Sequence, residues 1–250
     1  MRTAALRDEL AGLGFHESGF GRRRLYLASE IAAYAASVNH HLIADRFAVQ
    51  SAFGNRRSAF ALTVAGLPPM FVRRYRRGGL MRFLVAELYA GTVPRPLHEL
   101  RVTAAAHRRG LPVVEPMGAM VEAAGPCLYR GWLLTRALHG TTLWELLLSA
   151  PQPQARRQAL HQARAAIDRL HEGGLYHADL NLHNLFVYSD EQRPGVVVLD
   201  LDKARLYPGA LPARIRRNNF SRLARSARRL AAAGPSLADD ERAILGIGPI

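Results

Sequence analysis

A two-residue alternation of apolar and polar positions begins near residue 47 and recurs in three short runs, Ala48 to Phe53, Ser58 to Val64 and Met70 to Tyr75. Glycine, asparagine and proline separate the runs, as expected for turns. Because successive side chains of a strand point to opposite faces, this period is typical of half-buried β-strands. The pattern therefore predicts a three-stranded antiparallel meander.

The residues before the meander, 1 to about 47, mix helical patterns with polar breaks. The clearest pattern lies between Ser29 and Ala44, where apolar residues recur at helical spacing at Ile31, Tyr34, Ala35, Val38 and Leu42. Such a stripe is typical of a helix that packs on a core. We expect a helix there and assign it no functional role.

After the meander, the period becomes that of a helix over Pro96 to Arg109. Proline fits the first helical turn, and Gly110 suits the position just beyond the last one. Apolar runs then favour strands again, and Gly131 to Leu138 is interpreted as the last strand and the hinge to a second lobe. We therefore expect a first lobe of residues 1–138 and a second lobe of residues 139–250.

The second lobe is predicted to be mainly helical. Thr141 or Thr142 can cap a helix from Leu143 to Ala150, and a longer helix covers Gln154 to Glu172 with its apolar stripe inward. A third helix is predicted from Arg214 to Ala233, where an apolar stripe stands among many arginines. This last helix has two interpretations: it lies on an anionic bilayer, or it packs on its lobe with a solvated basic face.

Composition narrows the class of protein. The chain has 250 residues, of which 49% are hydrophobic, so it can bury a full core. The N-terminal residues include Asp8 and Glu9 and lack an apolar core, which argues against a signal peptide, and no later run approaches the roughly 20 apolar residues of a membrane span. The single cysteine, Cys127, allows no internal disulfide and no zinc motif. We therefore expect a cytoplasmic protein.

The net charge of +14 comes almost entirely from arginine, because Lys203 is the only lysine in the sequence. Such a charge attracts nucleic acid, anionic membrane surfaces and phosphorylated substrates alike. The charge therefore indicates an anionic partner without specifying its class.

The stretch with the clearest chemistry runs from His177 to Asn184 and reads HADLNLHN, and the apolar run after it ends in an aspartate, Asp200. In-line phosphoryl transfer requires a carboxylate beside the attacking hydroxyl and oxygen ligands for Mg²⁺. Asp179 suits the first role, and Asn184 and Asp200 suit the second. The stretch matches the kinase pattern H-R-D-L-x-x-x-N, with Ala178 in place of arginine.

Two other interpretations of this stretch remain open. His177, Asp179 and His183 could form a metal cluster, or the loop could simply join two strands of an ordinary sheet. Neither explains the aspartate that ends the apolar run downstream, so the catalytic interpretation is favoured.

The last strand of the meander carries the candidate phosphate-binding residue. Strand alternation places Arg73 and Tyr75 on the same face. Arg73 is the candidate cation for the phosphates of ATP, and Glu99 on the following helix is the candidate partner that holds it. Gly54, in the first turn of the meander, is a weak candidate for a phosphate-binding loop, because a single glycine equally suits an ordinary hairpin.

Together these motifs resemble those of the lipopolysaccharide-core sugar kinases, and within that family the kinases of 3-deoxy-D-manno-octulosonic acid (Kdo). The segments that carry the resemblance are Phe71–Leu80, Glu99 with Arg109–Val113, Leu133–Arg136, Tyr176–Asn184 and Leu199–Asp202. The resemblance implies a protein-kinase-like α+β fold of two lobes, with an antiparallel β-sheet in the first and mainly helices in the second. It also implies ATP and Mg²⁺ as cofactors, and phosphorylation of the 4-hydroxyl of Kdo on a lipid A precursor.

Residue by residue, the resemblance makes Asp179 the base, Asn184 and Asp200 the metal ligands, and Arg73 with Glu99 the pair that positions the phosphates. Two positions depart from the wider kinase pattern. Arg73 stands where kinases carry lysine, which changes how the nucleotide is positioned. Asp202 replaces the glycine of the Asp-Phe-Gly motif, which argues against an activation-loop switch.

The resemblance further implies a peripheral location at the cytoplasmic face of the bacterial inner membrane. The expected partners are the Kdo-bearing glycolipid and the anionic membrane surface, and no nucleic acid is expected. Three alternatives remain: a heptose kinase of the lipopolysaccharide core, a soluble small-molecule kinase similar to the aminoglycoside kinases, and a basic pseudokinase scaffold. The intact Asp179, Asn184 and Asp200 argue against the scaffold.

Overall fold

The structure is a computed structural model, and it describes residues 2–44, 59–75, 88–149, 152–189, 195–234 and 236–248. The chain forms two compact units. Unit 1 comprises residues 1–105 and 115–137, and unit 2 comprises residues 106–114 and 138–250.

Unit 1 is built on an antiparallel β-sheet. Within the described residues its strands are β1 (Phe15–Phe20), β2 (Arg23–Ala28), β3 (Ala59–Leu62), β4 (Met70–Arg74), β5 (Tyr89–Ala90), β6 (Pro116–Ala123) and β7 (Leu128–Arg136). Their order is β1-β2-β6-β7-β4-β3, and β5 also pairs with β7. Every pairing is antiparallel, and some neighbours, such as β2 and β6, are far apart in the sequence.

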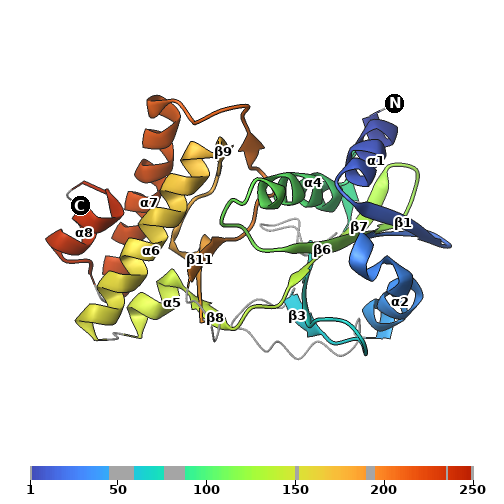
Figure 1. The fold of residues 1–250 in the computed structure, drawn as a ribbon, viewed down its shortest axis with the longest axis horizontal. Helices are drawn as coiled ribbons and strands as arrows, with labels where there is room; N and C mark the ends of the chain where they lie inside the picture. The colour runs from blue at the N-terminus through green and yellow to red at the C-terminus, as the bar shows by residue number, and fades with distance from the viewer. Residues whose placement is uncertain are drawn as a thin grey trace. The chain divides into compact units, whose positions relative to one another are not determined.

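Helices cover both faces of this sheet (Figure 1). Leu25 and Trp132 belong to the core shared with η1 (Ser29–Tyr34) and α2 (Ala35–Ala44). Their sequence neighbours Tyr26 and Leu133 belong to the opposite core, shared with α1 (Arg2–Gly12) and α4 (Arg95–Arg108). Because alternate residues of the central strands enter two different cores, these strands are apolar without a clean two-residue period.

Unit 2 is mainly helical. Its described elements are β8 (Gly140–Thr142), α5 (Leu143–Leu148), α6 (Pro153–Glu172), β9 (Leu175–Tyr176), η2 (Leu182–Asn184), β10 (Leu185–Tyr188), β11 (Gly195–Val198), β12 (Arg205–Leu206), α7 (Ala213–Ala233) and α8 (Asp239–Leu245). The strands form two small sheets, β11-β10-β8 and β12-β9. None of the described helices is long and apolar enough to span a bilayer.

Local signals explain where the helices of unit 2 begin and how they pack. Thr142 and Glu145 form a capping box at the start of α5, where the sequence predicted Thr141 or Thr142 as the cap. The stripe of α6 is buried from Ala159 to Leu170. On α7 the apolar stripe is also inward, with Leu223 and Leu230 fully buried, so this stripe packs within unit 2 and does not face a bilayer.

Residues 106–114 group with unit 2, although the sequence analysis placed them in the first lobe. Arg109 donates to the carbonyls of Gly173 and Tyr207, at 3.2 and 3.0 Å. Arg169 donates to the carbonyl of Gly110 at 2.6 Å, and Val113 forms a bridge to β11. These contacts hold the segment on unit 2, a tertiary effect that its local sequence does not show.

The predicted α+β fold is confirmed, since a unit built on an antiparallel sheet is joined to a mainly helical one. Two strands of the meander are present, because β3 and β4 pair with Leu62 opposite Met70. The first predicted strand, Ala48 to Phe53, lies outside the described residues. The expected Ser29–Ala44 helix is present as η1 and α2, with its first turns in 3₁₀ form.

One expectation about the fold is wrong, since β-structure begins well before residue 47. β1 and β2 form an antiparallel hairpin with Phe15 opposite Ala28. β1 is mostly exposed, and β2 buries three consecutive residues, Leu25 to Leu27. Neither strand therefore shows the alternation on which the sequence analysis relied.

Candidate active site

Four hydrogen bonds connect residues of the loop between β9 and β10 with one another and with Leu199. His177 Nε2 donates to the Leu199 carbonyl, and the Leu199 N–H donates to the Asn184 carbonyl, both at 2.9 Å. Asn184 Nδ2 donates to the Asp179 carbonyl at 2.9 Å, and the Asp179 N–H donates to His177 Nδ1 at 3.1 Å. The bonds connect four residues, which we call the loop ring: His177, Asp179, Asn184 and Leu199. It brings Asp179, Asn184 and the residue before Asp200 together.

His177 is the most buried member of the loop ring, at 1% exposed. Both of its ring nitrogens are hydrogen bonded, Nε2 as a donor and Nδ1 as an acceptor. Burial lowers the pKa of His177, because desolvation disfavours the charged imidazolium. Because Nδ1 accepts a hydrogen bond from a backbone N–H, it carries no proton in this arrangement, and both nitrogens serve to hold the loop.

The alternative of a metal cluster at His177, Asp179 and His183 is not supported. Across the part of the chain that the structure describes, no group of three or more His, Cys, Asp or Glu side chains could hold a metal ion. The His183 ring instead stacks on Trp144, with 4.4 Å between ring centroids. Both histidines thus have structural contacts.

The buried face of α7 supports the loop ring from outside. Asn219 Nδ2 donates to the His177 carbonyl at 2.6 Å, and the Leu182 N–H donates to Ser226 Oγ at 3.1 Å. Because the amide nitrogen of Asn219 is used, its oxygen accepts from His171 Nε2 on α6, at 3.1 Å. Asn219, Ser226 and His171 are all buried, so the bonds are shielded from water.

Asp200 follows β11 and has a left-handed backbone, with φ of 62°. Among the described residues, no other non-glycine residue has a positive φ. This conformation is costly for a residue with a Cβ and is concentrated at functional sites. Asp200 and Asp179 are both exposed residues, so a ligand in solution can reach them.

Asn184 of the loop ring and the adjoining Asp200 offer oxygen ligands that suit a hard cation. Asn184 is buried, and its Nδ2 is used by the Asp179 carbonyl, which leaves the amide oxygen as the acceptor. Asn184 and Asp200 thus provide an amide and a carboxylate oxygen, the ligand types that Mg²⁺ prefers. Two protein ligands are enough for an ion that also binds phosphate oxygens and water.

In unit 1, the structure joins the two predicted phosphate-positioning residues. The Arg73 guanidinium on β4 forms an ion pair with Glu99 on α4. Tyr75 OH donates to the same carboxylate oxygen and accepts from Arg73 Nη2 at 3.3 Å. Glu99 is 1% exposed and Tyr75 is buried, whereas the Arg73 side chain keeps 26% of its surface accessible. We call these residues the charged trio.

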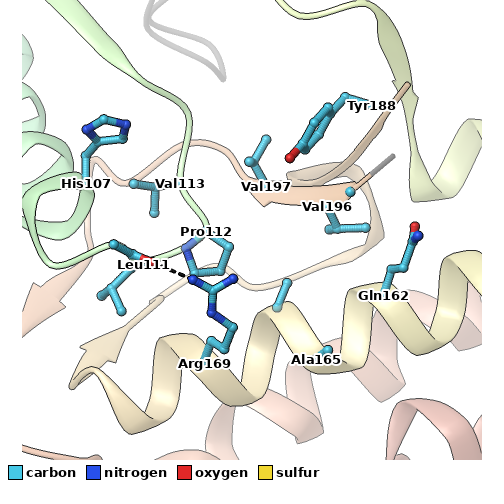
Figure 2. A pocket seen from close by; sticks show the side chains of 13 residues that line it. His107, Leu111, Pro112, Val113, Gln162, Ala165, Arg169, Tyr188, Val196 and Val197 are labelled. Carbon is cyan, nitrogen blue, oxygen red and sulfur yellow. Dashed lines mark hydrogen bonds between the residues drawn. The ribbon is translucent and has the colours of Figure 1, made fainter. Parts of the chain in front are cut away.

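A separate pocket of about 500 Å³ lies wholly within unit 2 (Figure 2). Its floor is apolar and includes Val113, Val196 and Val197. Arg169 reaches across one side and donates to the Gly110 carbonyl, as the dashed line in Figure 2 shows. None of the predicted site residues lines this pocket, so we do not assign it to the candidate active site.

The predicted site residues therefore occur in two groups. Asp179, Asn184 and Asp200 are brought together by the loop ring, and Arg73 is joined to Glu99 in the charged trio. Gly54 lies outside the described residues.

Sequence reasoning missed four supporting residues, which are Tyr75, His171, Asn219 and Ser226. A signal existed for Tyr75, because strand alternation places it on the face of Arg73. For Asn219 and Ser226, the signal is that both polar residues fall on the apolar stripe of α7, where a polar side chain requires a buried partner.

Comparisons with known proteins identify the family of the chain. The profile of the family described as "Lipopolysaccharide kinase (Kdo/WaaP) family" matches residues 45–242. A 3-deoxy-D-manno-octulosonic acid kinase of Mannheimia succiniciproducens is 30% identical over 158 residues, or 62% of this chain and 64% of that one. A kinase of the same name from Xylella fastidiosa is 32% identical over 177 residues, or 69% of this chain and 67% of that one.

A solved structure titled "WaaP in complex with acyl carrier protein" covers 75% of this chain and 71% of its own, at 16% identity and a TM-score of 0.48. The chain spans just under two thirds of the Mannheimia relative. The profile match covers most of the chain and defines the class of protein as a kinase. The chain belongs to the lipopolysaccharide kinase (Kdo/WaaP) family, as its motifs predicted, and this membership implies the use of ATP.

Proposed function

We propose that this chain is an ATP-dependent kinase that phosphorylates the 4-hydroxyl of Kdo on a lipid A precursor, in the synthesis of the lipopolysaccharide inner core. Membership of the family and the names of the relatives support this acceptor. The observation that carries the mechanism is the loop ring, because it holds an exposed carboxylate, Asp179, beside an amide and a second carboxylate.

Asp179 is proposed as the base. The acceptor hydroxyl attacks the γ-phosphorus of ATP, its proton passes to the Asp179 carboxylate, and ADP leaves with the electrons of the broken P–O bond. The backbone of Asp179 is held at both ends, since its N–H donates to His177 and its carbonyl accepts from Asn184. The ring thus orients the carboxylate without using its oxygens.

Asn184 and Asp200 are proposed to hold Mg²⁺, which their oxygen donors suit. When bound with ATP, the ion would neutralise negative charge on the phosphates. In the charged trio, Glu99 and Tyr75 hold the Arg73 guanidinium in one orientation, and guanidinium can bind phosphate oxygens through two parallel hydrogen bonds. Arg73 is accordingly proposed as the cation that binds the nucleotide phosphates.

The proposed acceptor is a glycolipid that carries carboxylate and phosphate groups, so the net charge of +14 favours its approach. The proposed location is the cytoplasmic face of the inner membrane, where the protein would be peripheral. The finding that no described helix could span a bilayer is compatible with this location.

The test is transfer of labelled phosphate from ATP, with Mg²⁺, to three acceptors in detergent micelles or solution: a Kdo-bearing lipid A precursor, a heptose-bearing core and an aminoglycoside. We expect label on the Kdo acceptor alone, at the 4-hydroxyl. Label only on heptose or only on the aminoglycoside would support a kinase activity but show that the acceptor is not Kdo. ATP binding without label on any acceptor would indicate a scaffold.

A further inference from the structure

Helix α7 has two faces with opposite properties. Its buried face carries the supports of the loop ring, Asn219 and Ser226. Its exposed face carries five arginines, which are Arg214, Arg217, Arg225, Arg228 and Arg229. At 3.6 residues per turn, these five lie within a sector of about 120° that is centred opposite the buried residues. The exposed face of α7 is therefore a single basic surface, which we call the α7 arginine face.

Within the described parts of the chain, no ion pair neutralises the charge of this face. The range Ala213–Ala233 contains seven arginines and no acidic residue. The ion pairs found among the described residues do not include any arginine of the α7 arginine face. From Arg214 to Arg229 the face extends over about 22 Å at 1.5 Å per residue. Such an array attracts a partner with several negative charges.

The mode of binding follows from where the apolar stripe lies. Leu223, Ala227 and Leu230 are fully buried within unit 2, so α7 cannot insert an apolar face into a bilayer. The exposed sector between the arginines contains the small polar residues Asn218 and Ser221 and no aromatic residue. It therefore lacks the stacking side chains with which proteins bind single-stranded nucleic acid. The face is suited to a surface bound by charge alone.

We propose that the α7 arginine face is the surface through which the protein rests on the anionic headgroups of a phospholipid bilayer. This inference rests on the proposed function, because a glycolipid acceptor requires the enzyme to work at a membrane. Since the opposite face of α7 holds the loop ring, binding through this helix would also fix the orientation of the proposed catalytic loop relative to the bilayer. The contact is electrostatic, so it weakens as salt is added.

The test is sedimentation of the full chain with vesicles that contain phosphatidylglycerol, compared with vesicles of phosphatidylcholine alone. The variant is the triple substitution Arg217→Gln, Arg225→Gln and Arg228→Gln. The matched control removes the same charge from exposed arginines elsewhere, with Arg22→Gln, Arg157→Gln and Arg205→Gln. A third protein, with lysine at the three α7 positions, keeps the charge. Thermal unfolding checks that each variant is folded.

We expect binding only to the anionic vesicles, and loss of most binding when salt rises from about 0.05 to about 0.5 M. The glutamine variant on α7 is expected to bind roughly 100-fold more weakly, and the lysine variant to bind normally. Equal losses in the α7 variant and the control would overturn the proposal, as would salt-independent binding. Binding to duplex DNA but not to vesicles would show that the partner of the α7 arginine face is nucleic acid and would overturn the proposal of a bilayer.

Failure here is distinguishable from failure of the proposed function, because phosphate transfer to the Kdo acceptor is measured separately in detergent micelles. Phosphate transfer without vesicle binding would refute the proposal that the α7 arginine face binds a bilayer and would support the kinase activity. Vesicle binding without transfer would keep the surface and refute the Kdo kinase.

Discussion

The two units fix their candidate functional residues by different means. In the charged trio of unit 1, Arg73 and Glu99 carry opposite charges, and the side chain proposed to bind phosphate is itself paired. In the loop ring of unit 2, all four bonds are between neutral groups, and each involves at least one backbone group. The trio therefore orients a side chain, whereas the ring orients a segment of chain.

This difference matches what each group is proposed to do. A cation that binds phosphate keeps its charge throughout, so a buried carboxylate can hold it. The Asp179 carboxylate must accept a proton, and a cation bound to it would oppose that step. Holding Asp179 through its N–H and carbonyl leaves its oxygens to the substrate. Damage to the ring should thus affect turnover, and damage to the trio should affect nucleotide binding.

Among substitutions outside the proposed base and metal ligands, the largest effect is expected from Asn219→Leu, which removes the donor to the His177 carbonyl and leaves that buried carbonyl without its partner. We expect kcat to fall on the order of 100-fold while KM for ATP changes less than about threefold, since the change affects the loop and its contact with His171 but not the charged trio. The matched control is Asn218→Leu, on the exposed face of α7. A rise in KM with unchanged kcat would show that Asn219 does not position the loop.

A smaller effect is expected from Glu99→Gln, which keeps a hydrogen-bonding oxygen for Tyr75 but removes the charge that holds Arg73. We expect KM for ATP to rise about 10-fold with a modest change in kcat, because a loosely held guanidinium binds phosphate less well in the ground state. Tyr75→Phe should have a weaker effect of the same kind. Steady-state kinetics at varied ATP measures both. A fall in kcat alone would assign the trio to the chemical step.

The smallest effect on activity is expected at a charged pair remote from both groups. Arg156 Nε and Nη2 bind the two Glu241 oxygens at 2.7 and 2.9 Å, and the two side chains are only 11% and 9% exposed. Glu241→Gln should lower the free energy of unfolding by about 2 kcal/mol at neutral pH and leave kcat unchanged. Asp240→Asn is the control, because Arg157 and Asp240 are 56% and 51% exposed and should contribute little.

The pH dependence of this pair has a definite sign. The hydrogen bonds from Arg156 lower the pKa of Glu241 below its ordinary value of 4.5. Stabilisation by the pair is therefore complete above the unfolded-state pKa and disappears as the pH falls through the lower folded-state pKa. The free energies of unfolding of the wild type and of Glu241→Gln, measured with denaturant, should become equal in acid. A constant difference between them down to low pH would contradict the assignment.

The sequence was most informative where a local pattern has a local cause. A cap at Thr141 or Thr142 could be predicted because these threonines directly precede an apolar run, and α6 could be predicted from its stripe. The spacing of Asp179 and Asn184 marked the loop because both residues belong to the same short turn. These predictions needed no knowledge of what packs on the segment.

Other features depend on contacts between distant segments. Asn219 follows His177 by 42 residues in the sequence, so the sequence could indicate a buried polar residue but not its partner. β1 and β2 were missed because one is exposed and the other is buried on successive positions, which removes the period of two. The segment 106–114 was assigned to the first lobe because its contacts with Gly173 and Tyr207 are tertiary.

The most direct test of the account is phosphate transfer to the Kdo acceptor by wild type and Asp179→Asn, with ATP affinity measured on both proteins. Asparagine keeps the shape of the side chain and the backbone bonds of the loop ring but cannot accept the proton. The account predicts turnover on the order of 1,000-fold lower with ATP affinity within about twofold of wild type. Unchanged turnover, or a loss explained by weaker ATP binding, would contradict it.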